Sequence, residues 1–307
     1  SLRLRGNVRQ RQGDTKQALA DLREALDLVR GMGDHAGEAR TRYLIGSIQA
    51  KSDDPVGAID ELQLALTAAQ QQGDQRIVER IYAALTRLHR QTGQHDRAIE
   101  TMEEWIRVLK ELGDRGEQLR VLGSLAKTHS DRGSVDEAEA YFRRLIRVCT
   151  RPIDEGEKLY AQHGLAMVLQ KQERLDEAIP LLEAAVEGYT RHSREPQSTI
   201  QPPVPLARLH AQLGNCLLER KKAEEALIHF EFARHQLEME DELGDEDQRE
   251  SNRNLLARVL VGLGNAHHQL SRSHDAREFF DQAASICETQ GDMRATMIIR
   301  RRTDGLG

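Results

Sequence analysis

A Gly-Asp pair that returns every 40 residues constrains this chain more than any other feature of its sequence. The pair stands at Gly33-Asp34, Gly73-Asp74 and Gly113-Asp114, and the next position is taken by Ile153-Asp154. A glycine that ends one helix, followed by an aspartate that caps the next, is expected at such a boundary. Repetition at a fixed period of this length indicates a solenoid, in which each unit packs mainly on its neighbours.

Small residues recur where two helices of a unit would cross. An alanine falls early in every expected second helix, and these are Ala18, Ala58, Ala98, Ala138, Ala178, Ala226 and Ala276. A small or tight residue in the first helix precedes each of them, and these are Gly6, Gly46, Thr86, Ala126, Ala166, Gly214 and Gly264. Large apolar residues such as Met102, Phe142 and Phe230 follow one turn after the alanine. Antiparallel helices approach closely only where one presents Gly or Ala, so this pattern predicts paired helices.

The order of small residue, alanine and large apolar residue resembles the tetratricopeptide repeat (TPR). The resemblance implies an all-α fold, a right-handed α-solenoid of about seven TPR-like helix pairs with a C-terminal capping helix. We expect one solenoid over residues 1–303, with repeats near 1–31, 34–72, 74–112, 114–150, 154–191, 204–242 and 250–290 and a cap at 292–303. The 40-residue form and the tripeptides Leu213-Gly214-Asn215 and Leu263-Gly264-Asn265 look most like the Pins/LGN family of adaptors.

Two segments interrupt the period. Residues 193–205 hold four prolines and predict a non-helical loop. Residues 238–250 hold eight acids and one base, whereas the whole chain has a net charge of −6. Both segments are interpreted as solvated linkers between repeats, and the alternative is that one of them folds over the binding surface and occupies it.

Several classes of function are disfavoured by the sequence. Outside 238–250 the charges nearly balance, so a basic surface for nucleic acid is not expected. The chain has no apolar stretch long enough to span a membrane. Its three cysteines, Cys149, Cys216 and Cys287, are too few and too scattered for a disulfide framework, which favours a reducing, cytoplasmic location. No metal site, cofactor motif or catalytic constellation is found, so we expect no cofactor and no enzyme activity.

The expected binding surface is a stripe on the first helices of the repeats. Residues seven apart return to the same side of a helix, and this stripe is separate from the one that packs on the second helix. Its candidate peptide-binding residues are Arg40, Arg80, Arg87, Arg90, Arg120, Lys127, Tyr160, Arg208, Asn215, Arg258 and Asn265. Arginine offers a planar fork for carboxylates, and asparagine can bond a peptide backbone with both its C=O and its NH₂. The stripe therefore predicts a groove for an extended, acidic peptide.

Two alternatives remain open at this point. The basic side chains can pair with acids of neighbouring repeats, such as Glu38, Glu79 and Glu117, which is what exposed charges on helices usually do. The acidic segment 238–250 can also fill the groove from within the same chain.

The function that these residues favour is a protein–protein interaction scaffold or adaptor whose partner is a protein or peptide. The chain begins with Ser and opens directly on a helical pattern, so we expect it to be a piece of a longer protein. The alternative function is therefore a regulatory or peptide-sensing repeat array of a larger signalling protein, with an effector domain outside this piece.

Overall fold

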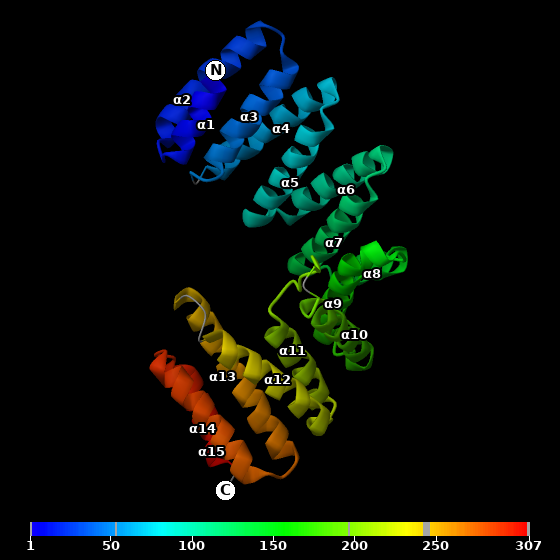
Figure 1. Ribbon diagram of the computed structural model, residues 1–307, viewed down its shortest axis with the longest axis vertical. Coiled ribbons are helices and arrows are strands. Elements are labelled where there is room, and N and C mark those ends of the chain that lie inside the picture. The colour runs from blue at the N-terminus through cyan, green and yellow to red at the C-terminus, as the bar shows by residue number, and fades with distance from the viewer. Residues whose placement is uncertain (1, 53, 196, 242–245, 306–307) are drawn as a thin grey trace. The chain divides into compact units, whose positions relative to one another are not determined.

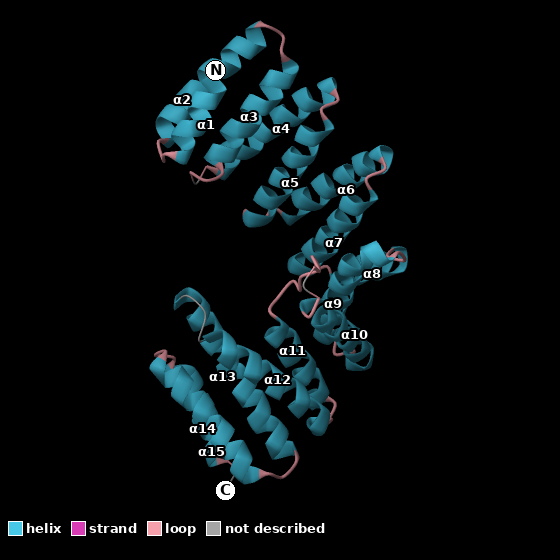
Figure 2. Cartoon of the chain, in the orientation of Figure 1, coloured by secondary structure: helices cyan, strands magenta, loops and turns pink. Residues whose placement is uncertain are grey.

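A computed structural model describes residues 2–52, 54–195, 197–241 and 246–305. These residues fold into fifteen α-helices and one short 3₁₀ turn, and no strand occurs among them (Figures 1 and 2). The all-helical class expected from the sequence is confirmed. The chain divides into two compact units, residues 1–141 and 142–307, each of which is described by itself. The continuity of one solenoid over 1–303 and its right-handed superhelix stay predictions.

Unit 1 contains the first seven helices and the start of the eighth. They are α1 (Leu2–Arg11), α2 (Thr15–Gly31), α3 (His35–Gln49), α4 (Pro55–Gln72), α5 (Gln75–Gln91), α6 (His95–Leu112), α7 (Arg115–Arg132) and α8 (Val135–Val148). Unit 2 contains the end of α8 and the remaining helices. They are α9 (Glu155–Lys171), α10 (Leu175–Ser193), α11 (Leu206–Glu219), α12 (Ala223–Asp241), α13 (Glu246–Gln269), α14 (Ser273–Thr289) and α15 (Met293–Asp304), with the 3₁₀ turn η1 (Pro152–Asp154) before α9.

The Gly-Asp pairs end one helix and start the next, as the period predicts. Gly73 lies at the end of α4 with a left-handed φ of +65°, a conformation that glycine adopts without a steric penalty. Asp74 follows as the N-cap of α5, and its carboxylate accepts a hydrogen bond from the Ile77 backbone N–H. Asp34 and Asp114 cap α3 and α7 in the same way.

The fourth copy of the pair behaves differently because Ile153 replaces the glycine. A β-branched residue is disfavoured in the left-handed conformation that glycine adopts at the other boundaries. Ile153 lies instead in the 3₁₀ turn η1, and its side chain is exposed. Asp154 caps α9 without its side chain, which instead accepts a hydrogen bond of 2.8 Å from the Arg151 guanidinium. The repeat boundary is therefore kept here by an ion pair within one turn of chain.

The helix crossings lie at the small residues that the sequence pattern selects. The seven alanines of the second helices are all fully buried. A Cβ built on Gly46 would lie 3.0 Å from the Ala58 carbonyl oxygen and 3.0 Å from Leu62, and a Cβ on Gly264 would lie 2.6 Å from the ring of Phe280. The first and second helices of these repeats thus approach so closely that a methyl group does not fit without movement.

One of the two interruptions of the period is shorter than the sequence predicts. α12 ends at Asp241, close to the end of the predicted repeat at 242, but α13 begins at Glu246 and not near 250, so part of the acidic segment 238–250 is helical. Acidic residues in the first turn of a helix are stabilised by its macrodipole, which favours this early start of α13. The proline-rich segment forms the expected loop between α10 and α11 (Figure 2), and its Ile200 packs beside Gly156 at the start of α9.

None of the described helices is long and apolar enough to cross a membrane. The three cysteines are buried free thiols, and burial raises the pKa of the Cys216 thiol to about 11. They act as small apolar side chains in the helix packing.

Candidate functional site

Arg40, the first candidate on the stripe, joins two neighbouring repeats. Its Nη2 lies 2.7 Å from Asp74 Oδ2, so a residue of α3 binds the carboxylate that caps α5. This hydrogen bond holds the pKa of Asp74 below its ordinary value. Arg40 is thus committed to a contact between repeats, although more than half of its side chain remains exposed.

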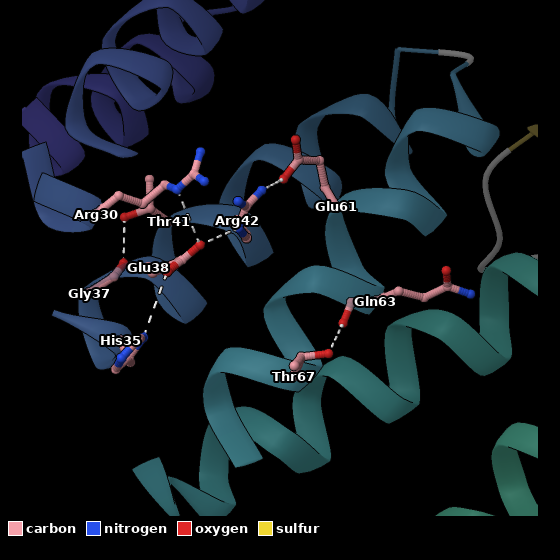
Figure 3. Close-up of polar contacts among 9 residues, drawn as sticks. All are labelled: Arg30, His35, Gly37, Glu38, Thr41, Arg42, Glu61, Gln63 and Thr67. Atoms are coloured by element: carbon pink, nitrogen blue, oxygen red, sulfur yellow. Dashed lines mark hydrogen bonds and ion pairs between the residues drawn. The ribbon is translucent and has the colours of Figure 1, made fainter. Parts of the chain in front are cut away.

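Arg42, two residues further along α3, is a structural residue. Its Nε donates to Glu38 Oε1 at 2.9 Å and its Nη1 to Glu61 Oε2 at 2.8 Å, which ties α3 to α4 (Figure 3). Arg30 Nε of α2 lies 3.8 Å from the same Glu38 carboxylate. Glu38, the alternative partner for the stripe arginines, therefore pairs with Arg42 and Arg30, neither of which is a candidate of the stripe.

Arg80 and Arg120 have local partners. The Arg80 guanidinium lies over the ring of Tyr43, 4.9 Å from its centroid, in a cation–π contact between α5 and α3. Arg120 pairs with Glu117 one turn earlier on α7. Burial raises the pKa of Glu117, and Arg120 is the largest influence that lowers it. Both arginines remain exposed, so a partner can still reach them.

Arg87, Arg90 and Lys127 come from α5 and α7, and two of them meet at one carboxylate. Asp131 accepts hydrogen bonds from Arg90 Nη2 at 3.3 Å and from Lys127 Nζ at 3.0 Å. Arg87 is exposed and pairs with none of the described carboxylates. Arg87 therefore stays available to an anion. The neighbouring Arg90 and Lys127 already bind an anionic group, the carboxylate of Asp131.

A pocket of about 490 Å³ lies beside this cluster, between α5, α6 and α7. Arg87, Arg90 and Asp131 line it, and so do Trp105 and Thr86; the sequence pattern assigned Thr86 only to a helix crossing. A signal for Trp105 was present, because its repeat position holds Ala or Leu in the other repeats. A tryptophan brings a polar N–H that needs a partner, whereas alanine and leucine do not.

The candidates of unit 2 are more scattered. Arg208, Asn215 and Arg258 lie on α11 and α13 and are exposed, and none of them bonds to a described side chain. Asn265 Oδ1 accepts a hydrogen bond of 3.1 Å from Arg302 of α15, so the C-terminal helix contacts the last position of the stripe. Tyr160 is half-buried, with its ring 6.4 Å from that of Phe142.

The alternative in which segment 238–250 fills the groove stays a prediction, because it falls largely on residues outside those that the structure describes. Residues 242–245 are not described, and neither are the side chains that flank them. Among the described residues, no group of three or more His, Cys, Asp or Glu has the arrangement of a metal site.

Unit 2 also holds a buried pair of histidines between α11 and α12. His210 Nδ1 and His229 Nδ1 lie 3.0 Å apart, and the His210 ring stacks on Phe232. Burial, with a smaller effect of His229, lowers the pKa of His210 to about 4, and burial also lowers the pKa of His229. Both rings are therefore neutral at pH 7, and the N–H of one ring donates a hydrogen bond to the bare nitrogen of the other.

The paired helices and the small residues at their crossings define a helical-repeat protein. Three tetratricopeptide repeat models match residues 1–71, 159–193 and 257–290. A fourth model, the rapsyn N-terminal myristoylation and linker region, matches residues 69–155. The chain therefore contains tetratricopeptide repeats, as the resemblance in the sequence implied.

Solved structures with the same fold are distant in sequence. One is a signal-transduction ATPase with numerous domains and a tetratricopeptide repeat sensor from Pyrococcus horikoshii, at 12% identity and a TM-score of 0.65, covering 97% of this chain and 44% of that one. Another is the apo form of RapI, at 12% identity and a TM-score of 0.60, covering 93% of this chain and 80% of that one. Comparison with curated protein sequences gave no match.

Proposed function

We propose that this chain is a non-catalytic protein–protein interaction scaffold whose first helices bind an extended, acidic segment of a partner. The observation that carries the proposal is the exposed Arg87 beside the cluster of Arg90, Lys127 and Asp131. The other basic stripe residues of unit 1, Arg40, Arg80, Arg90, Arg120 and Lys127, have partners inside the chain, whereas Arg87 pairs with none of the described carboxylates.

The geometry supports an extended ligand more than a compact one. Arg80 and Arg87 are seven residues apart on α5, and Arg120 and Lys127 are seven apart on α7, so each pair shares one side of its helix. Arg80, Arg87, Arg120 and Lys127 are all exposed. An extended peptide can reach several such residues in turn, and arginine binds carboxylates with two parallel hydrogen bonds.

The proposal is tested by fluorescence anisotropy with a labelled acidic peptide. Binding is expected to weaken steeply when salt is raised from about 0.1 M to about 1 M, because the screening length falls from about 10 Å to about 3 Å. Charge reversal by Arg80→Glu with Arg87→Glu is expected to abolish binding without loss of helical circular dichroism. Arg107→Glu, on the exposed side of α6, is the matched control. Equal binding by wild type and the double variant at both salt concentrations would refute the proposal.

A second candidate function is a sensor array within a larger signalling protein. The observation that favours it is the coverage of 97% of this chain by a repeat structure whose own description names a tetratricopeptide repeat sensor, in a protein of more than twice this length. The two functions differ in what the ligand does to the array. A sensor changes its shape on binding, whereas a scaffold keeps it, and small-angle X-ray scattering with and without the peptide separates them.

Two finer assignments belong to the same proposal. The tripeptides that end in Asn215 and Asn265 support a relationship with the Pins/LGN adaptors, but no comparison supports that family by name. Asn215 is exposed and can bond a peptide backbone, whereas Asn265 already bonds to Arg302. The buried free thiols support a reducing location such as the cytoplasm.

A further inference from the structure

Three residues that line the pocket between α5, α6 and α7 carry buried polar atoms that bond to no described residue. They are Thr86 Oγ1 and Trp105 Nε1, on side chains that are each 7% exposed, together with His95 Nδ1. Buried polar groups in folded proteins nearly always have a hydrogen-bond partner. Three such atoms around one pocket are therefore a reason to look for a ligand that supplies the partners.

The chemistry of these groups selects an acceptor. The indole N–H of Trp105 can only donate a hydrogen bond, and the hydroxyl of Thr86 can donate one. Arg87 adds a positive charge at the same pocket and pairs with none of the described carboxylates. A carboxylate satisfies Trp105, Thr86 and Arg87 together, because its two oxygens accept several hydrogen bonds and carry a charge opposite to that of Arg87.

Asp131 shows that the pocket accepts such a group. Its carboxylate lines the same pocket and accepts hydrogen bonds from Arg90 and Lys127. The two arginines give the lining a positive balance over this one acid. A cationic ligand could approach Asp131, but it would meet Arg87 and Arg90 and would leave the Trp105 N–H without an acceptor.

We propose that this pocket is the subsite for one carboxylate of the bound acidic segment, with Trp105 and Thr86 as its hydrogen-bond donors and Arg87 as its counter-charge. The inference rests on the proposed function and adds to it two residues that lie outside the basic stripe. Thr86 is on α5 and Trp105 is on α6, so the subsite lies where the first and second helices of one repeat meet.

The test uses Trp105 as its own reporter, because it is the one tryptophan in the chain. A short peptide of alternating Asp and Ala with blocked ends is titrated into the protein, and the same peptide with Asn for Asp is the neutral probe. Tryptophan emission reports on the pocket, and anisotropy of a labelled copy of the peptide reports on binding anywhere. A hydrogen bond to the indole N–H is expected to shift the emission to longer wavelength.

Two conservative variants remove the contacts singly. Thr86→Val keeps the shape of the side chain and removes its hydroxyl, and Arg87→Gln removes the charge. Each is expected to weaken binding of the acidic peptide about tenfold, since a hydrogen bond to a charged group contributes this order of affinity. Thr41→Val and Arg76→Gln are matched controls on α3 and α5 and are expected to bind as wild type does.

The outcomes separate the subsite from the scaffold function. A shift in Trp105 emission that the Asn peptide does not give, and that both variants weaken, supports the subsite. A rise in anisotropy with unchanged emission, unaffected by Thr86→Val but weakened by Arg87→Gln, overturns the subsite and leaves the proposed function standing. If Arg87→Gln also binds as wild type does, both are overturned. No rise in anisotropy with the acidic peptide overturns both. An unblocked peptide of Ala alone tests a terminal carboxylate, and a shift with it but not with the Asp peptide would overturn the assignment to a side chain.

Discussion

Phe230 of α12 is held between two glycines of the neighbouring first helices, and this contact permits a quantitative prediction. The ring is fully buried. A Cβ built on Gly262 of α13 would lie 2.5 Å from two of its carbons, and a Cβ built on Gly214 of α11 would lie 2.9 Å from the ring. Gly262→Ala therefore places a methyl group where a rigid aromatic ring already sits.

Two opposing effects set the size of the change in stability. Alanine in a helix interior is better than glycine by about 1 kcal/mol. Overpacking of a close-packed core costs about 1–3 kcal/mol, and the upper end applies because the ring has no free space to enter. We expect Gly262→Ala to lower the free energy of unfolding by about 2 kcal/mol. For a unit of this size, that corresponds to roughly 4–8 °C in the melting temperature.

The assay is urea and thermal unfolding followed by circular dichroism. Gly156→Ala is the matched control, because its new Cβ would make only an ordinary contact of 3.5 Å with Ile200. Phe230→Leu in the Gly262→Ala background is expected to recover part of the loss, because the two residues touch and their effects are coupled. The packing argument is refuted if Gly262→Ala is as stable as wild type, or if Phe230→Leu adds its full cost to that of the alanine.

Three further predictions concern other parts of the chain. Ala98→Trp is expected to destabilise unit 1 by several kcal/mol, on the order of a severe overpacking, and unchanged melting would show that the repeat register is wrong. Arg42→Met is expected to cost about 2 kcal/mol in urea unfolding, because it leaves two half-buried glutamates without their shared partner; a loss no larger than that of an exposed arginine would contradict this. Stability is expected to fall as the pH is lowered from about 6.5 towards 4. The pKa values of His210 and His229 are lower in the folded state than in the unfolded state, so in that window the unfolded chain binds more protons. The free energy of unfolding therefore rises with pH. His210→Phe should flatten this dependence in a pH series of melting curves, and an equal effect of changing the exposed His268 would contradict it.

The helix pairs could be predicted from the sequence because their causes are local. Gly73 adopts the left-handed conformation that ends α4, and Asp74 caps α5, as the spacing of the pair predicts. The approach at Gly46 and Ala58 follows from the absence of side-chain atoms at both positions. Each of these features depends on residues within one repeat, so one sequence is enough to find them.

The start of α13 could not be placed from the sequence alone. A run of acidic residues is typical of a solvated linker, but the same residues stabilise a helix when they lie in its first turn. Glu246 begins α13 because the apolar residues that follow pack against α12 and α14, which extends the helix toward its acidic end. The acidic residues are compatible both with a linker and with a helix N-terminus, so tertiary packing decided where α13 begins.

The candidate site was predicted in its chemistry but not in its pairing. The sequence identifies Arg40, Arg87 and Arg90 as equivalent or neighbouring basic residues on first helices, and the physical reason is helical periodicity. Only the tertiary structure shows that Arg40 binds the cap of the next repeat, that Arg90 shares Asp131 with Lys127, and that Arg87 stays available. An ion pair depends on distances between repeats of a few ångströms, and the order of residues along one chain does not contain these distances. The same holds for Thr86, which the sequence placed at a helix crossing, and for Trp105, because only the fold brings the two residues to one pocket.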